Sequence, residues 1–182
     1  MGDLLWLRGE TALARHDANA AAGYLEEAVR LQRTASDNGR NALYIRSLHA
    51  IALAQAGRDN DARQVLTSAA GLGGTPPVPS YANAMFRAAQ GITALHAGDA
   101  RTAMVALQDA LDQLEQARRL PADVHNQLRE NRDAVRLRLW LAHAQQAASD
   151  PMAATTLSQA QQLADTTLGP AHPFTRMARA SL

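Results

Sequence analysis

The side chains that could carry out chemistry are histidines, serines and carboxylates, and their spacing fits no common catalytic or metal-binding motif. A zinc site on a helix needs two histidines four residues apart, with a further ligand nearby. None of the six histidines is spaced in this way, and the chain contains no cysteine. We therefore expect no bound metal, and a disulfide bond is excluded. The histidines are His16, His49, His96, His125, His143 and His172.

Motifs for nucleotide binding and for nucleophilic catalysis are missing as well. A phosphate-binding loop ends in a lysine followed by serine or threonine, and the chain has no lysine. The glycine-rich stretch at 71–74 lacks the strand and helix context of a dinucleotide site. Ser80, Ser158 and Ser181 lie outside any G-x-S-x-G setting and have no evident base. We therefore expect no enzymatic activity and no cofactor.

Charge and hydropathy restrict the partners and the compartment. Eighteen arginines balance 17 acidic residues to a formal charge of +1, so the sequence carries no electrostatic footprint for nucleic acid. It contains no apolar run of 18 residues and no signal-peptide layout, so we expect no membrane insertion by this chain. A cytoplasmic location is the simplest expectation. A periplasmic one remains open if the chain is part of a membrane-anchored signalling protein.

A repeat with a step of 41 residues organises the chain. Alanine occupies 40 of the 182 positions, and aromatic residues make up only 4%. A stripe of alanine, leucine and alanine, spaced to share one helical face, recurs three times with this step, and a weaker fourth copy follows after 50 residues. The four stripes are Ala21, Leu25 and Ala28; Ala62, Leu66 and Ala69; Ala103, Leu107 and Ala110; and Ala153, Leu157 and Ala160.

Each unit is predicted to be an antiparallel pair of helices, because a short turn such as "AGRD" or "AGD" separates its two amphipathic halves. We predict one all-α domain over 1–182, with units at about 3–38, 40–74, 80–120 and 123–166. A capping helix at 173–181 should cover the fourth pair. We expect the chain to be part of a larger protein. The helices are predicted at 3–15 and 18–35, 40–56 and 59–71, 80–97 and 100–119, 123–148 and 151–166, and 173–181.

The pattern resembles the tetratricopeptide repeat, in the long-unit variety found in kinesin light chains and in bacterial regulators and kinases. The tail "LGPAHP" is similar to a loop of the kinesin-light-chain variety. His16 stands where the family has a turn glycine, and the 41-residue step exceeds the family's usual length of about 34. The third unit carries the family's small residue, turn glycine and helix stripe at Gly91, Gly98, Ala103, Leu107 and Ala110.

The resemblance implies an α-α superhelix whose concave side, lined by the first helix of each pair, binds a partner. The family's inner positions, carried over residue by residue, place mostly apolar side chains on that side. Leu48, Ile51 and Ile92 have an equally good interpretation as core. The predicted concave residues are Trp6, Leu7 and Glu10; Tyr44, Ser47, Leu48 and Ile51; Met85, Ala88, Ala89, Ile92 and His96; and Arg138, Ala142 and Gln145.

Two functions stay open at this point. The first is a non-catalytic interaction module, which holds a peptide or helix of another protein in the concave groove, with homo-oligomers possible. The second is a regulatory or sensory domain of a larger bacterial signalling protein, which responds to a small ligand or docks an intramolecular domain. The family's carboxylate clamp for chaperone tails is not expected, because its lysines and asparagines are replaced here and Glu10 would repel a carboxylate.

Overall fold

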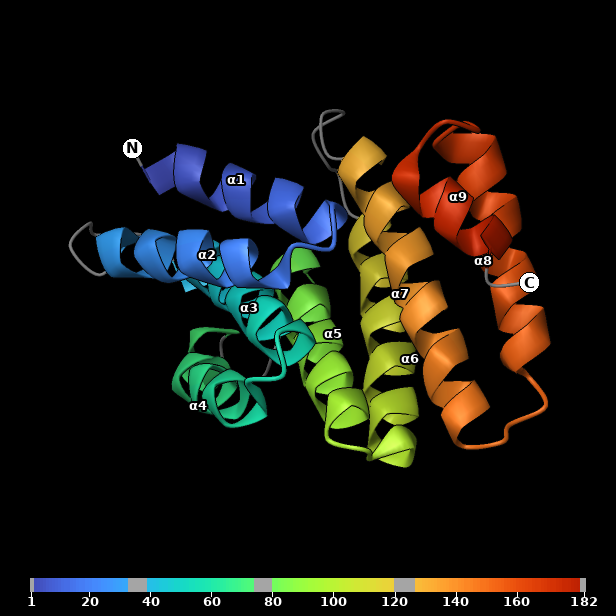
Figure 1. Ribbon diagram of the computed structural model, residues 1–182, viewed down its shortest axis with the longest axis horizontal. Helices are drawn as coiled ribbons and strands as arrows, with labels where there is room; N and C mark the ends of the chain where they lie inside the picture. Colours follow the sequence, from blue (N-terminus) through green and yellow to red (C-terminus); the bar gives the residue numbers. More distant parts are fainter. Residues whose placement is uncertain (1, 33–38, 74–79, 120–126, 181–182) are drawn as a thin grey trace.

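A computed structural model describes residues 2–32, 39–73, 80–119 and 127–180, which form helices joined by short turns and contain no strand (Figure 1). The predicted all-α fold is confirmed for this part of the chain. A short 3-10 turn, Ala70–Gly73, extends the fourth helix. The helices are α1 (Gly2–Ala14), α2 (Ala18–Gln32), α3 (Gly39–Gln55), α4 (Asp59–Ala69), α5 (Tyr81–His96), α6 (Ala100–Arg118), α7 (Gln127–Ala147), α8 (Ala153–Thr167) and α9 (Pro173–Ala180).

The predicted helix bounds agree with these elements to within about two residues wherever both can be compared. The predicted continuations at 33–35, 123–126 and 181 lie outside the described residues. Each helix pair packs together, and the second helix of one pair packs against the first helix of the next. The described part of the chain therefore forms an all-α superhelical array.

The turns inside the four pairs share one backbone feature, a residue in the left-handed region. Glycine fills this position in the second and third pairs, with φ of 75° at Gly57 and 83° at Gly98. The first and fourth pairs use His16 and Ser149 instead, with φ of 60° and 57°. The repeat in sequence therefore coincides with a repeat in turn conformation. In the first and fourth pairs the left-handed residue has a side chain, so its backbone is strained.

Small residues let the two helices of a pair approach closely. A Cβ atom added to Gly9 would lie 2.5 Å from Leu25 Cγ, and one added to Gly91 would lie 2.7 Å from Leu107 Cγ. The alanines of the stripe are fully buried in the same interfaces; Ala103, for example, has no exposed surface. The positions that repeat most faithfully in the sequence are thus those that set the distance between helices.

The array turns as it proceeds, so that α1 and α2 lie at a steep angle to α5, α6 and α7 (Figure 1). Side chains of the first helices of the pairs, α1, α3, α5 and α7, meet on one side of the array, which we call the concave side. The capping helix α9 closes the other end and packs on α7 and α8, with Phe174 and Ala178 buried beneath it. None of the described helices combines the length and apolar character needed to cross a membrane.

Candidate functional site on the concave side

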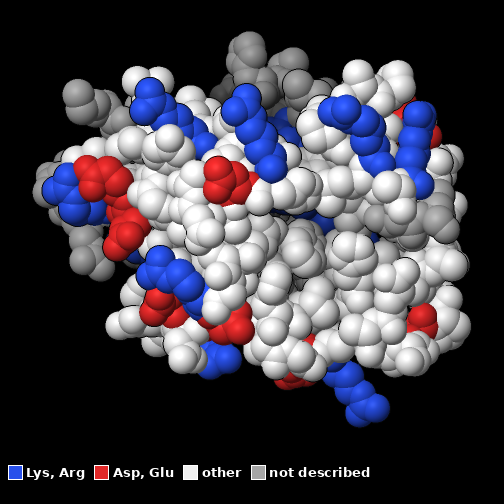
Figure 2. All heavy atoms as spheres, viewed as in Figure 1, with Lys and Arg blue, Asp and Glu red and all other residues white. Residues whose placement is uncertain are grey.

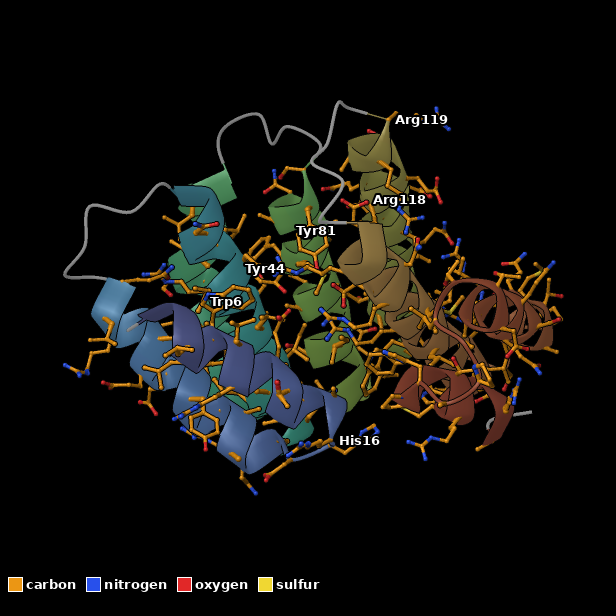
Figure 3. The ribbon with its side chains drawn as sticks, turned by 90° about the horizontal axis from the view of Figure 1, so that it is seen from above. Trp6, His16, Tyr44, Tyr81, Arg118 and Arg119 are labelled. Carbon is orange, nitrogen blue, oxygen red and sulfur yellow. The ribbon has the colours of Figure 1, made fainter. Side chains whose placement is uncertain are left out.

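A cluster of charged and aromatic side chains fills the middle of the concave side. We call it the central cluster, and Figure 3 shows its three rings lying close together between α1, α3 and α5. Four of its members come from successive turns of α7 and reach across the concave side to the other three helices. The central cluster consists of Trp6 and Glu10, Tyr44, Tyr81, and Arg129, Arg132, Asp133 and Arg136.

Glu10 connects the first helix pair to the fourth through a contact with Arg132. Its Oε1 atom accepts a hydrogen bond from the hydroxyl of Tyr44 and another, 3.0 Å long, from Arg132 Nη2. Glu10 and Arg132 are 122 residues apart in the chain, and the Glu10 side chain is only 8% exposed. Burial and the charges of Asp133 and Glu10 raise the pKa of Tyr44, so this hydroxyl remains a donor.

Asp133 forms the second centre of the central cluster. Tyr81 donates its hydroxyl to Asp133 Oδ2, and the Nη2 atoms of Arg132 and Arg136 lie 3.3 and 3.0 Å from its oxygens. Full burial alone would raise the pKa of Asp133, but the charges of Arg136 and Arg132 outweigh it and hold the pKa below its usual value. Asp133 is therefore a buried carboxylate that stays ionised.

The rings of the central cluster surround the guanidinium of Arg129. Its Cζ atom lies 4.9 Å from the ring centre of Trp6, 5.6 Å from that of Tyr44 and 6.0 Å from that of Tyr81. Trp6 meets Tyr44 edge to face with ring centres 6.0 Å apart. The aromatic rings therefore bind a cation that the protein itself supplies.

The predicted site residues divide into two groups. Trp6, Glu10 and Tyr44 do come together on the concave side, as the sequence predicts, but Glu10 and Tyr44 are buried beneath α7. Ser47 and Met85 have no exposed surface, and Ser47 Oγ donates to the carbonyl of Leu43 on its own helix. The other fully buried members of the predicted set are Leu48, Ile51, Ile92, Ala88, Ala89 and Ala142.

An open, partner-facing surface is thus the wrong expectation for Ser47, Leu48 and Met85, because helix packing covers these side chains completely. The alternative interpretation of Leu48, Ile51 and Ile92 as core is the correct one. Leu7 is 44% exposed and is absent from the central cluster.

The fourth-unit residues show a shift in register. Arg138 is half-buried, donates to the carbonyl of Ala134, and interacts electrostatically with Glu115 and Arg118 of α6. It therefore lies away from the central cluster, where Arg136 stands instead. Gln145 is buried, and its Oε1 atom has no hydrogen-bond partner among the described residues.

A cavity of about 350 Å³ lies next to the central cluster, and we call it the concave pocket. Five parts of the fold line it: the α1–α2 turn, the ends of α3 and α5, one face of α7, and α9. Figure 3 shows His16 at the opposite end of α1 from Trp6, where this pocket begins. The lining residues are Leu13, His16, Ala18, Gln55, His96, Arg136, Leu139, Trp140, His143, Phe174 and Met177.

Aromatic and imidazole rings make one wall of the concave pocket. The ring centre of Trp140 lies 5.7 Å from that of His96 and 5.8 Å from that of His143. Burial lowers the pKa of His143, so its imidazole is neutral at pH 7. The exposed His96 at the end of α5 is the predicted concave residue that does line a cavity.

Arg136 connects the central cluster to the concave pocket. Its Nη2 atom binds Asp133 and lies 3.9 Å from Met85 Sδ. The Nε atom is buried and has no hydrogen-bond partner in the described part of the chain, although nearly all buried donors in proteins are paired. Arg136 thus lines the cavity and also carries one unused donor, which is itself buried.

Sequence reasoning missed Tyr81 and the side chains of α7. Their signal is present in the sequence, because the α7 residues fall at helical spacing on one face. The repeat was recognised by its apolar stripe, and most of these side chains are charged. They were therefore not recognised as a site. The residues on this face are Arg129, Arg132, Asp133, Arg136, Trp140 and His143.

A second hollow of about 580 Å³ lies between α4 and α5. It is larger than the concave pocket, but it is an open groove between two helices and receives no side chain from α1, α7 or α9. Thr93 contributes a buried hydroxyl without a hydrogen-bond partner among the described residues. The concave pocket is the better candidate site because more elements converge on it.

Within the described ranges, no three His, Asp or Glu side chains come together as a metal site. A scan against models of known protein families gives no match, and a search of curated proteins gives none either.

Proposed function

We propose that this chain is a non-catalytic, ligand-binding regulatory domain in which a small molecule occupies the concave pocket. The observation that carries the proposal is the pocket itself, a cavity of about 350 Å³ bounded by α1, α3, α5, α7 and α9. Small-molecule sites in proteins start at roughly 300 Å³ and combine apolar walls with a few polar groups. The concave pocket meets both conditions, with Leu13, Leu139 and Phe174 among its apolar residues.

The packing on the concave side argues against a bound helix, the other function that the sequence left open. The middle of the concave side is filled by the arginines of α7, where a partner helix would need to lie. A ligand of small-molecule size is therefore the better fit.

A regulatory role follows from the position of the concave pocket between the two ends of the array. His16 belongs to the first pair, Trp140 and His143 to the fourth, and Phe174 to the capping helix. A ligand touching all of them favours the arrangement in which these elements are close together. Such a ligand would change the relative position of the first and last helices, which is a signal that adjoining domains of a larger protein can read.

The absence of catalysis is part of the proposal. The described lining of the concave pocket contains no carboxylate, hydroxyl or thiol group, and its ionisable residues are three histidines and Arg136. Proton transfer by a histidine needs a nucleophile or a second polar group to act upon. The repeat pattern and the close contacts at Gly9 and Gly91 support a solenoid of the tetratricopeptide type as the scaffold.

The proposal is tested by thermal-shift screening of a small-molecule collection against the wild type and an Ala18→Phe variant. Ala18 lines the concave pocket at the start of α2, so a phenylalanine there fills part of the cavity. A ligand at 100 times its Kd stabilises the folded state by about 2.7 kcal/mol. The proposal expects compounds that raise the melting temperature of the wild type and not of the variant. Hits that shift both proteins equally, or binding only to a protein partner, would overturn it.

A further inference from the structure

We infer that the concave pocket takes a small amphipathic monocarboxylate, with the carboxylate against Arg136 and the apolar body against Trp140 and Phe174. This inference rests on the proposed function and names the chemical class of its ligand. It depends on the charges that line the pocket, on the position of Arg136 in its wall and on the balance of charge in the central cluster.

Every ionisable residue in the described lining of the concave pocket is basic. Arg136 contributes a guanidinium, and His16, His96 and His143 contribute imidazoles. A cationic ligand would therefore meet no carboxylate in the pocket. An anion would be attracted by the charge of Arg136.

Arg136 offers the donor that an anion needs. Its side chain is 9% exposed, and its Nη2 atom is committed to Asp133 at 3.0 Å. The Nε–H group remains without a partner among the described residues, and it belongs to a residue that lines the cavity. Nε has almost no exposed surface, so a carboxylate would pair with the part of the Arg136 side chain that lines the pocket.

The balance of charge in the central cluster favours a single negative charge on the ligand. Glu10 and Asp133 supply two negative charges, whereas Arg129, Arg132 and Arg136 supply three positive ones. The excess of one positive charge is neutralised by a carboxylate. A phosphate dianion would replace it with a negative excess inside a largely buried cluster, which is unfavourable.

Exposed arginines also lie on the surface near the concave pocket, together with Asp17, which stands between two of the lining residues. Figure 2 shows arginine side chains gathered along the upper edge of this face, over α1 and α9, the two helices on either side of the pocket. Arg8, Arg15 and Arg176 are exposed, and no ion pair in the described part of the chain involves them. These arginines attract anions toward the pocket from solution, an effect that weakens as salt is added.

The remaining lining defines the body of the ligand. Leu13, Leu139, Phe174 and Met177 are apolar, and Trp140 offers a ring face. A cavity of about 350 Å³ lies at the small end of the range for small-molecule sites. The ligand class is therefore a carboxylic acid with a short alkyl chain or one or two rings.

The test compares three probes of one shape by titration calorimetry on the intact chain at pH 7: octanoate, 1-octanol and octylammonium. Octanoate should bind at least ten times more tightly than either of the others. The Ala18→Phe variant should weaken octanoate binding at least tenfold, because it fills the site. Arg136→Gln should bring the affinities for octanoate and 1-octanol within about threefold of each other, provided that its circular dichroism shows a native helical content.

The outcomes separate this inference from the proposed function. If 1-octanol or octylammonium binds the wild type as tightly as octanoate, and Ala18→Phe weakens that binding, the pocket is a ligand site but the carboxylate assignment is wrong. If no probe binds, or if Ala18→Phe leaves octanoate binding unchanged, the site itself fails and the inference fails with it. The comparison of probes needs no variant at Arg136, so it decides the matter even if that variant does not fold.

Discussion

Replacing Glu10 by glutamine should destabilise the protein, because it removes the charge that joins the first helix pair to the fourth. Glu10 Oε1 accepts from the Tyr44 hydroxyl and from Arg132 Nη2, and the Glu10 side chain is 8% exposed. Removing one partner of a fully buried ion pair costs about 3–5 kcal/mol. Arg132 is 23% exposed and keeps its contact with Asp133 at 3.3 Å, so the cost falls below that range. We expect a loss of about 2–3 kcal/mol.

A chain of this length loses about 2–4 °C of melting temperature per kcal/mol, so the Glu10→Gln variant should melt roughly 5–10 °C below the wild type. The measurement is thermal unfolding followed by circular dichroism at pH 7. The matched control is Glu27→Gln, the same chemical change in the exposed pair that Glu27 forms with Arg30. Glu27→Gln should leave the melting temperature unchanged within error, because exposed pairs contribute little.

A double-mutant cycle locates the effect. Glu10→Gln combined with Arg132→Gln should destabilise less than the sum of the two single changes, with a coupling of about 1–3 kcal/mol. Equal melting temperatures for Glu10→Gln and Glu27→Gln, or strict additivity with Arg132→Gln, would refute the view that this contact holds the two ends of the array together.

Three further changes test the turns, the interfaces and the buried titratable groups. Gly98→Ala should cost about 1–2 kcal/mol, measured by denaturant unfolding, because φ is 83° at this turn. Ala103→Leu should cost about 1–3 kcal/mol by overpacking a fully buried site, whereas Val105→Leu on the exposed face of the same helix, the control, should cost almost nothing. Burial lowers the pKa of His49 below 6.5, so the stability it contributes is complete above pH 6.5 and is lost as the pH falls through its folded pKa. His49→Gln should flatten the fall in melting temperature between pH 7 and 5, and an unchanged fall would contradict this assignment. The charged groups acting on His49 are Glu26, Arg58 and Asp61.

The helix pairs could be predicted because each is encoded locally. The stripe of small and large apolar residues needs only its own pair to be satisfied, as the contacts of Gly9 with Leu25 and of Gly91 with Leu107 illustrate. The turns could be found for the same reason, since a left-handed residue is needed wherever two helices reverse direction so abruptly. Even the exception at His16 was visible as a departure from glycine.

The contents of the concave side could not be predicted in the same way. Whether Arg132 meets Glu10 depends on how far the whole array turns, and that turn is the sum of small rotations at each interface between pairs. An error of two residues in the register of the fourth unit then exchanges Arg136 for Arg138, which lies on the α6 side. The helical spacing on α7 shows that its charged residues share a face. It does not show which residues of the other helices contact that face.

The contact between Glu10 and Arg132 changes how the array should lose its structure. Helical solenoids commonly open from their ends, because each repeat is held only by its neighbours. Here α1 can detach only if Glu10 leaves the network that Arg132 forms with Glu10 and Asp133. Amide hydrogens in α1 should therefore exchange with solvent at rates close to those in α7, and the contact spanning 122 residues should form late, after the individual pairs have folded. The first and fourth helix pairs would then unfold together, whereas the outer repeats of an open solenoid unfold separately.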